Sequence, residues 1–138
     1  MQETLTLADI LNLVGERIAG AGIDEADAIQ RKLSDTGKPW SAVSAWVVID
    51  VINIPAGCMP KPMLPLVLGA HHVHPGEDHR FGSDRRVLTG FATCYDQRGI
   101  FETVDQVYIL VGKGFRKPAD YRLVGGFAGR LRDYTIDV

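Results

Sequence analysis

The fold of this chain is decided by residues 41–54, which read SAVSAWVVIDVINI. β-branched and aromatic residues fill this stretch, and such residues pack well on a pleated strand. Alternation divides it into two faces, one with Val43, Ala45, Val47, Ile49 and Val51 and the other with Ser44, Trp46, Val48, Asp50 and Ile52. Because both faces are largely apolar, we expect a central strand buried on both sides. Asp50 then needs a hydrogen-bonding partner, or a place at the edge of the sheet.

Two helices are predicted before this strand. The first has an apolar stripe at helical spacing, made of Leu7, Ile10, Leu11, Val14 and Ile18. It begins at Thr6 and Asp9, which resemble a capping box, and ends at the glycines of residues 20–22. The second helix begins at Asp24, a good N-cap, and stops at Gly37.

Strands are predicted for the rest of the chain. Residues 54–65 hold four prolines and are expected to form a surface loop, since proline donates no ladder hydrogen bond. Residues 66–74 are predicted as the next strand, although their apolar positions also fit a helical face. Residues 86–95 and 100–111 are predicted to form a hairpin whose connection ends at Gly99.

These elements give an α+β fold in which two N-terminal helices pack on a mostly antiparallel sheet that can curve toward a barrel. A last strand is expected around residues 134–138. With 138 residues, 46% of them hydrophobic and 23% charged, the chain has the size and composition of one globular domain. We therefore predict a single domain over residues 1–138, helical over residues 1–38 and mainly β over residues 40–138.

The composition argues against several classes of protein. The formal net charge is −2 with both signs mixed along the chain, whereas nucleic-acid-binding domains carry a basic stripe. Cys58 and Cys94 stand far apart and are predicted to be free thiols. No apolar run approaches the roughly 20 residues that cross a bilayer, and the N-terminus lacks the pattern of a signal peptide. We expect a cytoplasmic protein, in a bacterium or an infected host cell.

All four histidines lie in one short segment, residues 69–79, which read GAHHVHPGEDH. In an extended strand the side chains of His72 and His74 point the same way. A third ligand from the following loop, Glu77, Asp78 or His79, would complete a site for a divalent metal such as zinc, iron or manganese. The candidate metal ligands are His72, His74, Glu77 and His79. The alternative is a polar strand end whose histidines are exposed or bonded to the backbone.

Part of this segment resembles a known metal motif. Residues 72–78, HVHPGED, are similar to the first metal motif of the cupins, which place two histidines and a glutamate on a barrel strand. Cupins usually have the glutamate one position later, where this chain has Asp78. They also need a further histidine downstream, and the sequence has none after His79. The resemblance therefore covers half of the cupin pattern.

Three other segments resemble a loosely defined family of small uncharacterised proteins of proteobacteria and their phages. These segments are residues 46–50 (WVVID), 101–103 (FET) and 107–116 (VYILVGKGFR). They consist of strand residues and a glycine turn, which specify fold more than function. The resemblance implies an accessory protein of a mobile element, and such proteins often act by binding and blocking a host or phage protein.

Two functions follow from the sequence. The favoured one is a non-enzymatic protein without a cofactor that binds a protein partner, for example as an inhibitor or anti-defence factor, since no complete catalytic constellation is found. Its candidate contact residues are Met59, Met63, Arg85, Arg86 and Arg116. The second is a metal-dependent enzyme or metal-binding domain that uses the histidine cluster. A homodimer formed through an uncovered sheet edge is also expected.

Overall fold

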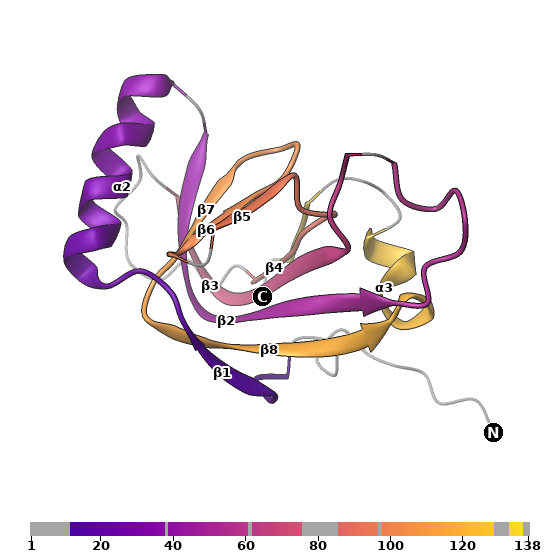
Figure 1. Cartoon of the computed structure of the whole chain (residues 1–138). Coiled ribbons are helices and arrows are strands. Elements are labelled where there is room, and N and C mark those ends of the chain that lie inside the picture. Colours follow the sequence, from indigo (N-terminus) through magenta and orange to yellow (C-terminus); the bar gives the residue numbers. More distant parts are fainter. Residues whose placement is uncertain are drawn as a thin grey trace.

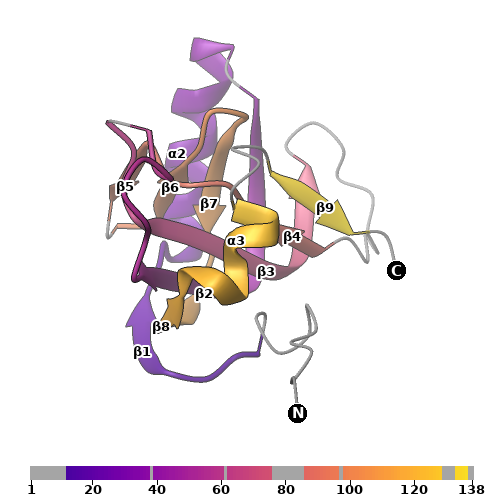
Figure 2. The same ribbon diagram turned by 90° about the vertical axis from the view of Figure 1, so that its right-hand side faces the viewer.

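The structure is a computed structural model, and it describes residues 12–37, 39–60, 62–75, 86–96, 98–128 and 133–136. Strands dominate and form one curled sheet, shaped like half a barrel (Figure 1). Helix α2 (Ile23–Thr36) and helix α3 (Tyr121–Ala128) lie at different ends of this sheet (Figures 1 and 2). The α+β class is confirmed. The placement of both helices in the N-terminal part is wrong, because α3 lies near the C-terminus.

Strand β2 (Trp40–Ile52) is the centre of the sheet. Along one side it pairs antiparallel with β3 (Leu66–Pro75). Along the other side it pairs in parallel, first with β7 (Val107–Leu110) and then with β8 (Lys113–Asp120). Strands β7 and β8 therefore lie end to end along one edge of β2. The prediction of a central strand buried on both sides is confirmed.

The remaining strands extend the sheet in the order β5-β6-β7-β2-β3-β4-β9, and β1 pairs with β8. Their bounds are β1 Glu16–Ala19, β4 Arg86–Leu88, β5 Cys94–Asp96, β6 Ile100–Glu102 and β9 Tyr134–Ile136. Six of the eight strand pairings in the described ranges are antiparallel. The mostly antiparallel sheet and the last strand near the C-terminus are confirmed.

Ala45 interrupts the regular alternation of faces within β2. Its φ is 50°, in the left-handed region that alanine rarely adopts. Val43 consequently lies in the same buried cluster as Trp46, while Val47 belongs to a different cluster with Ile49. The predicted alternation holds from Trp46 onward and is wrong for Val43.

The inside of the curled sheet holds the largest apolar cluster. Its buried members come from strands and their connections: Val43, Trp46, Val48, Leu66, Leu68, Ala70, Val73, Val87, Ala92, Phe101, Tyr108 and Leu110. On the outside, α2 packs Ala26 against Ala42 and Ile109, and α3 packs Val124 against Val47. The sheet thus has its main core inside the curl and one helix over each end of the outer surface.

The first predicted helix is wrong where the structure describes it. Residues 1–11 lie outside the described ranges, and Glu16–Ala19 form β1, which pairs with β8 from Lys113 to Arg116. Gly15 has a φ of 127°, which a right-handed helix cannot contain. Hydrogen bonding along β8 therefore outweighs the helical spacing of the apolar residues in this segment.

The second predicted helix is confirmed as α2. Gly22, rather than Asp24, is its N-cap, and the carboxylate of Glu25 accepts a hydrogen bond from the backbone N of Gly22 at 3.3 Å. Gly37 ends the helix with a left-handed φ of 72°.

The two long strands predicted between residues 86 and 111 are each divided. Residues 89–93 separate β4 from β5, and in this connection Thr89 Oγ1 accepts a hydrogen bond from the backbone N of Leu68 at 2.8 Å. A turn separates β6 from β7, where Thr103 Oγ1 accepts from the backbone N of Asp105 at 3.2 Å. The predicted turn that ends at Gly99, the loop after β2 and the strand assignment for residues 66–74 are confirmed.

Candidate functional site

Strand β3 carries two of the predicted metal ligands. His72 and His74 are both exposed, and the side chain of Val73 between them is buried. The two imidazoles therefore lie two residues apart on the solvent-facing side of one strand. Such a pair can supply two ligands to a metal ion.

The other predicted ligands, Glu77 and His79, lie outside the described residues, as does Asp78. Within the described ranges no group of three or more His, Cys, Asp or Glu side chains is placed to hold a metal ion. The described part of the histidine cluster thus consists of half-buried His71 and the exposed pair His72 and His74.

The predicted partner-binding residues occupy separate places in the fold. Met59 and Met63, predicted as exposed contacts, are half-buried in the loop after β2 and pack against the outer core. Arg86 is half-buried at the start of β4, and Arg116 lies on β8. Arg85 falls outside the described part of the chain.

Arg116 is the partner that Asp50 needs. Its Nε and Nη2 donate to the two carboxylate oxygens of Asp50 at 2.8 and 2.7 Å, and the guanidinium lies over the ring of Tyr95 at 5.8 Å from the centroid. The hydrogen bonds to Asp50 raise the pKa of Arg116 above its ordinary value, and burial raises the pKa of Tyr95. This bidentate pair ties β2 to β8 and places a cation beside β5.

Asp133 is the centre of a second polar cluster. One carboxylate oxygen accepts a hydrogen bond from the backbone N of Gly90 at 3.1 Å. The other accepts from Thr103 Oγ1 at 2.9 Å and from the hydroxyl of Tyr108. The backbone N of Asp133 donates to the carboxylate of Asp105 at 2.7 Å. One aspartate thus connects the segment after β4, the β6–β7 turn and β7.

The environment of this cluster changes the acidity of its groups. Burial raises the pKa of Asp133 above the ordinary value of a carboxyl group, although the three hydrogen bonds that it accepts act in the opposite direction. Burial also raises the pKa of Tyr108, and the neighbouring Asp133 carboxylate adds to this effect. Tyr108 therefore remains a neutral hydrogen-bond donor over the physiological range of pH.

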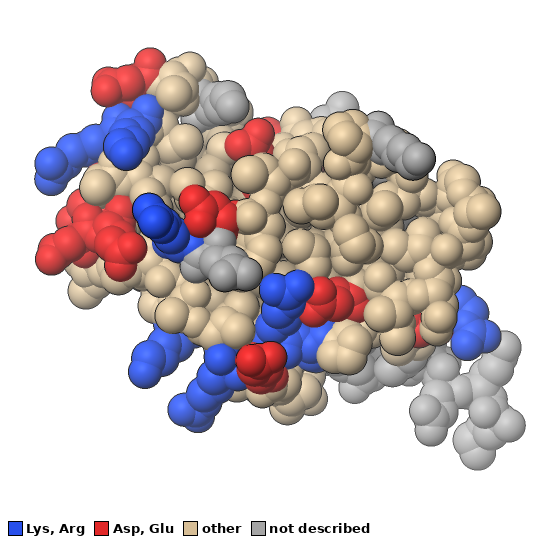
Figure 3. Space-filling view, viewed as in Figure 1, with Lys and Arg blue, Asp and Glu red and all other residues tan. Residues whose placement is uncertain are grey.

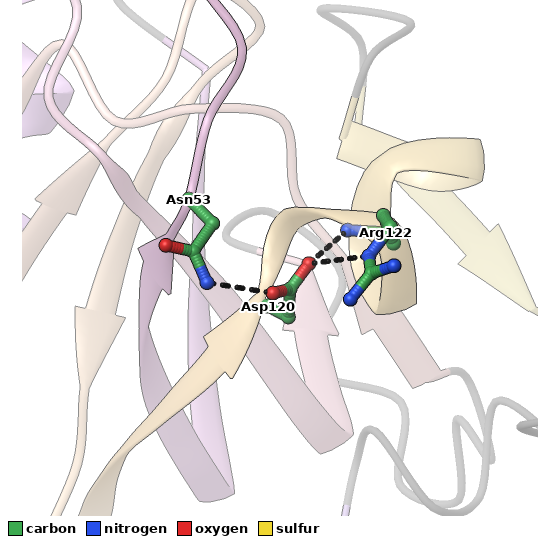
Figure 4. Close-up of polar contacts among 3 residues, drawn as sticks. All are labelled: Asn53, Asp120 and Arg122. Atoms are coloured by element: carbon green, nitrogen blue, oxygen red, sulfur yellow. Dashed lines mark hydrogen bonds and ion pairs between the residues drawn. The ribbon is translucent and has the colours of Figure 1, made fainter.

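A third polar group organises the start of α3 (Figure 4). Asp120 accepts a hydrogen bond from the side-chain amide of Asn53 at 2.8 Å and from the backbone N of Arg122 at 2.9 Å. These bonds lower the pKa of Asp120. The group caps the helix and ties it to the end of β2, so its contacts explain structure rather than ligand binding.

Two segments whose described residues are all uncharged form one face of the molecule, which we call the neutral face; Lys61, within the first segment of the sequence, lies outside the described residues. It consists of residues 52–60 and 62–65 of the loop after β2, and of residues 93–95 at β5. The backbone N of Leu64 donates to the carbonyl of Ala92 at 2.8 Å and so joins the two segments. In Figure 3 the half of the molecule that carries this loop shows few charged side chains, which gather instead around α2 and along the side of β1 and β8.

Apolar side chains are exposed on the neutral face. Ile52 and Leu64 are 46% and 37% exposed. Pro55, Pro60, Pro62 and Pro65 are also exposed, and Cys94 adds an exposed free thiol. Exposed apolar surface with few charges is typical of protein interaction sites.

The sequence predicts neither the neutral face nor the Asp133 cluster. The prolines predict the loop, but residues 93–95, which lie beside it in the fold, are separated from it in the chain by β3 and β4. The members of the Asp133 cluster come from three distant segments. The one sequence signal for that cluster is Tyr108 in a buried strand, because a buried tyrosine hydroxyl usually has a hydrogen-bond partner.

One family model matches the chain over residues 19–125, which run from the end of β1 into α3; its description is "Domain of unknown function (DUF6957)". No curated protein and no solved structure matches the chain. The match agrees with a loosely defined uncharacterised family and gives no support to a cupin. Among the described helices none is long and apolar enough to cross a membrane.

Proposed function

We propose that this chain, which belongs to the family described as Domain of unknown function (DUF6957), is a non-enzymatic protein that binds a protein partner through its neutral face. The observation that carries this proposal is the joining of two segments, uncharged in their described residues, into one surface that exposes Ile52 and Leu64. Covering apolar surface contributes about 25 cal/mol per Å². The described residues of this face carry no charge, so covering them with a partner adds no cost for removing charges from water.

The surroundings of the neutral face support the same proposal. Met59 and Met63 lie half-buried in the same loop, and methionine adapts its shape readily to a partner. Arg116 stacks on Tyr95 at the border of the face. Charged groups at the rim of an interface set orientation and association rate, while its apolar centre provides affinity. The proposed role is that of an accessory protein which acts by covering part of its partner.

Introducing a negative charge into the neutral face is expected to weaken partner binding strongly. Ala56→Glu and Leu64→Glu each place a carboxylate in surface that the partner would bury unpaired, so we expect binding to weaken at least about tenfold. The measurement is capture from the native host with the purified full chain, with the recovery of each co-purified protein compared quantitatively between wild type and variants. Thermal unfolding of each variant establishes that the fold is retained.

Ile23→Glu is the matched control for these variants. Ile23 is 76% exposed, more than Leu64, and lies on α2 at the other end of the molecule (Figure 1). A glutamate in the first turn of a helix is also well tolerated. Recovery of the same proteins with wild type, Leu64→Glu and Ile23→Glu would show that the neutral face binds no partner.

A second candidate function is metal binding by the histidine segment. The observation that favours it is the exposure of His72 and His74 on the same side of β3. Neutral imidazoles are good ligands for zinc, iron and manganese. This candidate requires further ligands beyond the described pair.

If His72 and His74 bind metal, protein purified without an affinity tag will contain equimolar metal by elemental analysis. The double variant His72→Ala, His74→Ala is expected to lose it, since each substitution removes a coordinating nitrogen. His71→Ala, which leaves the pair intact, is the control and is expected to keep the metal. Metal-free protein whose unfolding is unchanged by a chelator would rule this candidate out.

A further inference from the structure

The C-terminal strand β9 is attached to the sheet by a short ladder. It is the last strand in the sheet order, and its described pairing partner is β4. The two strands share three residue pairs, from Arg86–Ile136 to Leu88–Tyr134. Strand β4 is itself only three residues long. A ladder this short is weakly cooperative, so contacts outside it decide whether β9 stays in place.

Asp133, directly before β9, provides such contacts. Its carboxylate accepts hydrogen bonds from Gly90, Thr103 and Tyr108, and its backbone N donates to Asp105. These partners belong to parts of the sheet that β9 itself does not pair with. Leaving buried donors such as these without an acceptor is costly, so the contacts of Asp133 favour the closed position of β9.

We propose that the carboxylate of Asp133 is a pH-dependent latch that closes the C-terminal strand onto the sheet. This inference is independent of the neutral face. When the latch opens, β9 leaves β4 while the central strands remain folded. The latch is tight when Asp133 is protonated and weaker when it is ionised.

The direction of the pH effect follows from the groups around the carboxylate. In the described structure the titratable groups facing Asp133 are the hydroxyl of Tyr108 and the carboxylate of Asp105, while Thr103 and the Gly90 N–H are neutral donors. Burial and the like charge of Asp105 disfavour ionisation, and the hydrogen bonds favour it; burial has the largest effect, so the pKa is raised in the closed state.

A raised pKa means that the closed state binds the proton more tightly than the open state, in which Asp133 is a solvated carboxyl with a pKa of about 3.9. The stability that protonation gives to the closed state is fully present below that ordinary value. It is lost as the pH rises through the raised pKa. Between the ordinary pKa and the raised pKa of Asp133, the equilibrium constant for the opening of β9 changes by up to about tenfold per pH unit.

Amide hydrogen exchange of the full chain tests this latch. After correction for intrinsic exchange rates, protection of residues 134–136 in the wild type is expected to fall as the pH rises, while protection in β2 stays constant. Asp133→Asn keeps an acceptor for Gly90 and offers an amide that can donate to the hydroxyls of Thr103 and Tyr108, so the pH dependence should disappear. Asp133→Ala is expected to lower β9 protection about ten- to a hundredfold at every pH.

Two further variants keep the test decisive if a substitution at Asp133 prevents folding. Thr103→Val and Tyr108→Phe each remove one donor and leave Asp133 in place, so β9 should exchange faster at neutral pH. Asp35→Asn, an exposed acid on α2, is the control and should retain the wild-type profile. The proposal is overturned if β9 protection is independent of pH, if it rises with pH, or if β9 opens only together with β2.

Discussion

Replacing Gly114 by alanine is expected to destabilise the protein by about 3 kcal/mol, because the new methyl group has no room. A Cβ at this position would overlap the indole of Trp46 and lie 2.5 Å from its Cε2 atom. Trp46 is completely buried, and its Nε1 donates to the carbonyl of Val111 at 3.1 Å, so the ring cannot move aside without losing that bond. Urea unfolding followed by circular dichroism measures the loss.

Two comparisons separate this clash from a general effect of replacing glycine. Gly22→Ala is the matched control, since its Cβ would meet nothing closer than Glu25 Oε1 at 3.4 Å, and we expect it to cost less than about 1 kcal/mol. Combining Gly114→Ala with Trp46→Leu should destabilise less than the sum of the two single changes, because the shorter side chain leaves space for the methyl group. Wild-type stability of Gly114→Ala would mean that Trp46 does not pack against β8.

Replacing Phe101 by alanine is expected to cost about 3–5 kcal/mol, the usual range for removing a fully buried aromatic side chain. Phe101 has no exposed surface and lies inside the curl of the sheet. Its ring centroid lies 5.9 Å from that of Tyr95. The substitution removes contacts on several strands at once and leaves a cavity that the rigid sheet cannot close. Thermal and urea unfolding provide the measurement.

Phe115→Ala is the control for this second experiment. Phe115 is half-buried and packs with the outer cluster beneath α3. Because part of its ring already contacts water, the expected loss of unfolding free energy is smaller than for Phe101. A larger loss for Phe115 than for Phe101 would place the main core on the outer side of the sheet.

The sequence was sufficient where a pattern is local. Strand β2 is recognisable because nearly every residue from Val43 to Ile52 suits a buried strand, and α2 because Gly37 ends an apolar helical stripe. The sequence was insufficient where contacts between distant segments determine whether a strand or a helix forms. Strand β8 carries Arg116 and Pro118 within it and is defined by pairing with β2. Helix α3 contains two adjacent glycines and depends on the Asp120 cap and on packing of Val124.

The same distinction applies to the candidate sites. The histidine pair is visible in the sequence because its members are two residues apart on one strand. The neutral face and the Asp133 cluster are assembled from segments that meet only in the folded sheet. Ala45 shows a third kind of failure, because its left-handed backbone changes which residues share a face without any signal in the residue type.

The parallel pairing of β2 has a consequence for the order in which the protein assembles. During synthesis β2 can pair with β3 once Pro75 has left the ribosome, but the strands that cover its other edge run from Val107 to Asp120. Until then, the most apolar strand of the nascent chain has one unpaired edge. Pairings between segments so distant in sequence form slowly, and open edges promote aggregation. The second edge of β2 is therefore covered only when most of the chain has left the ribosome.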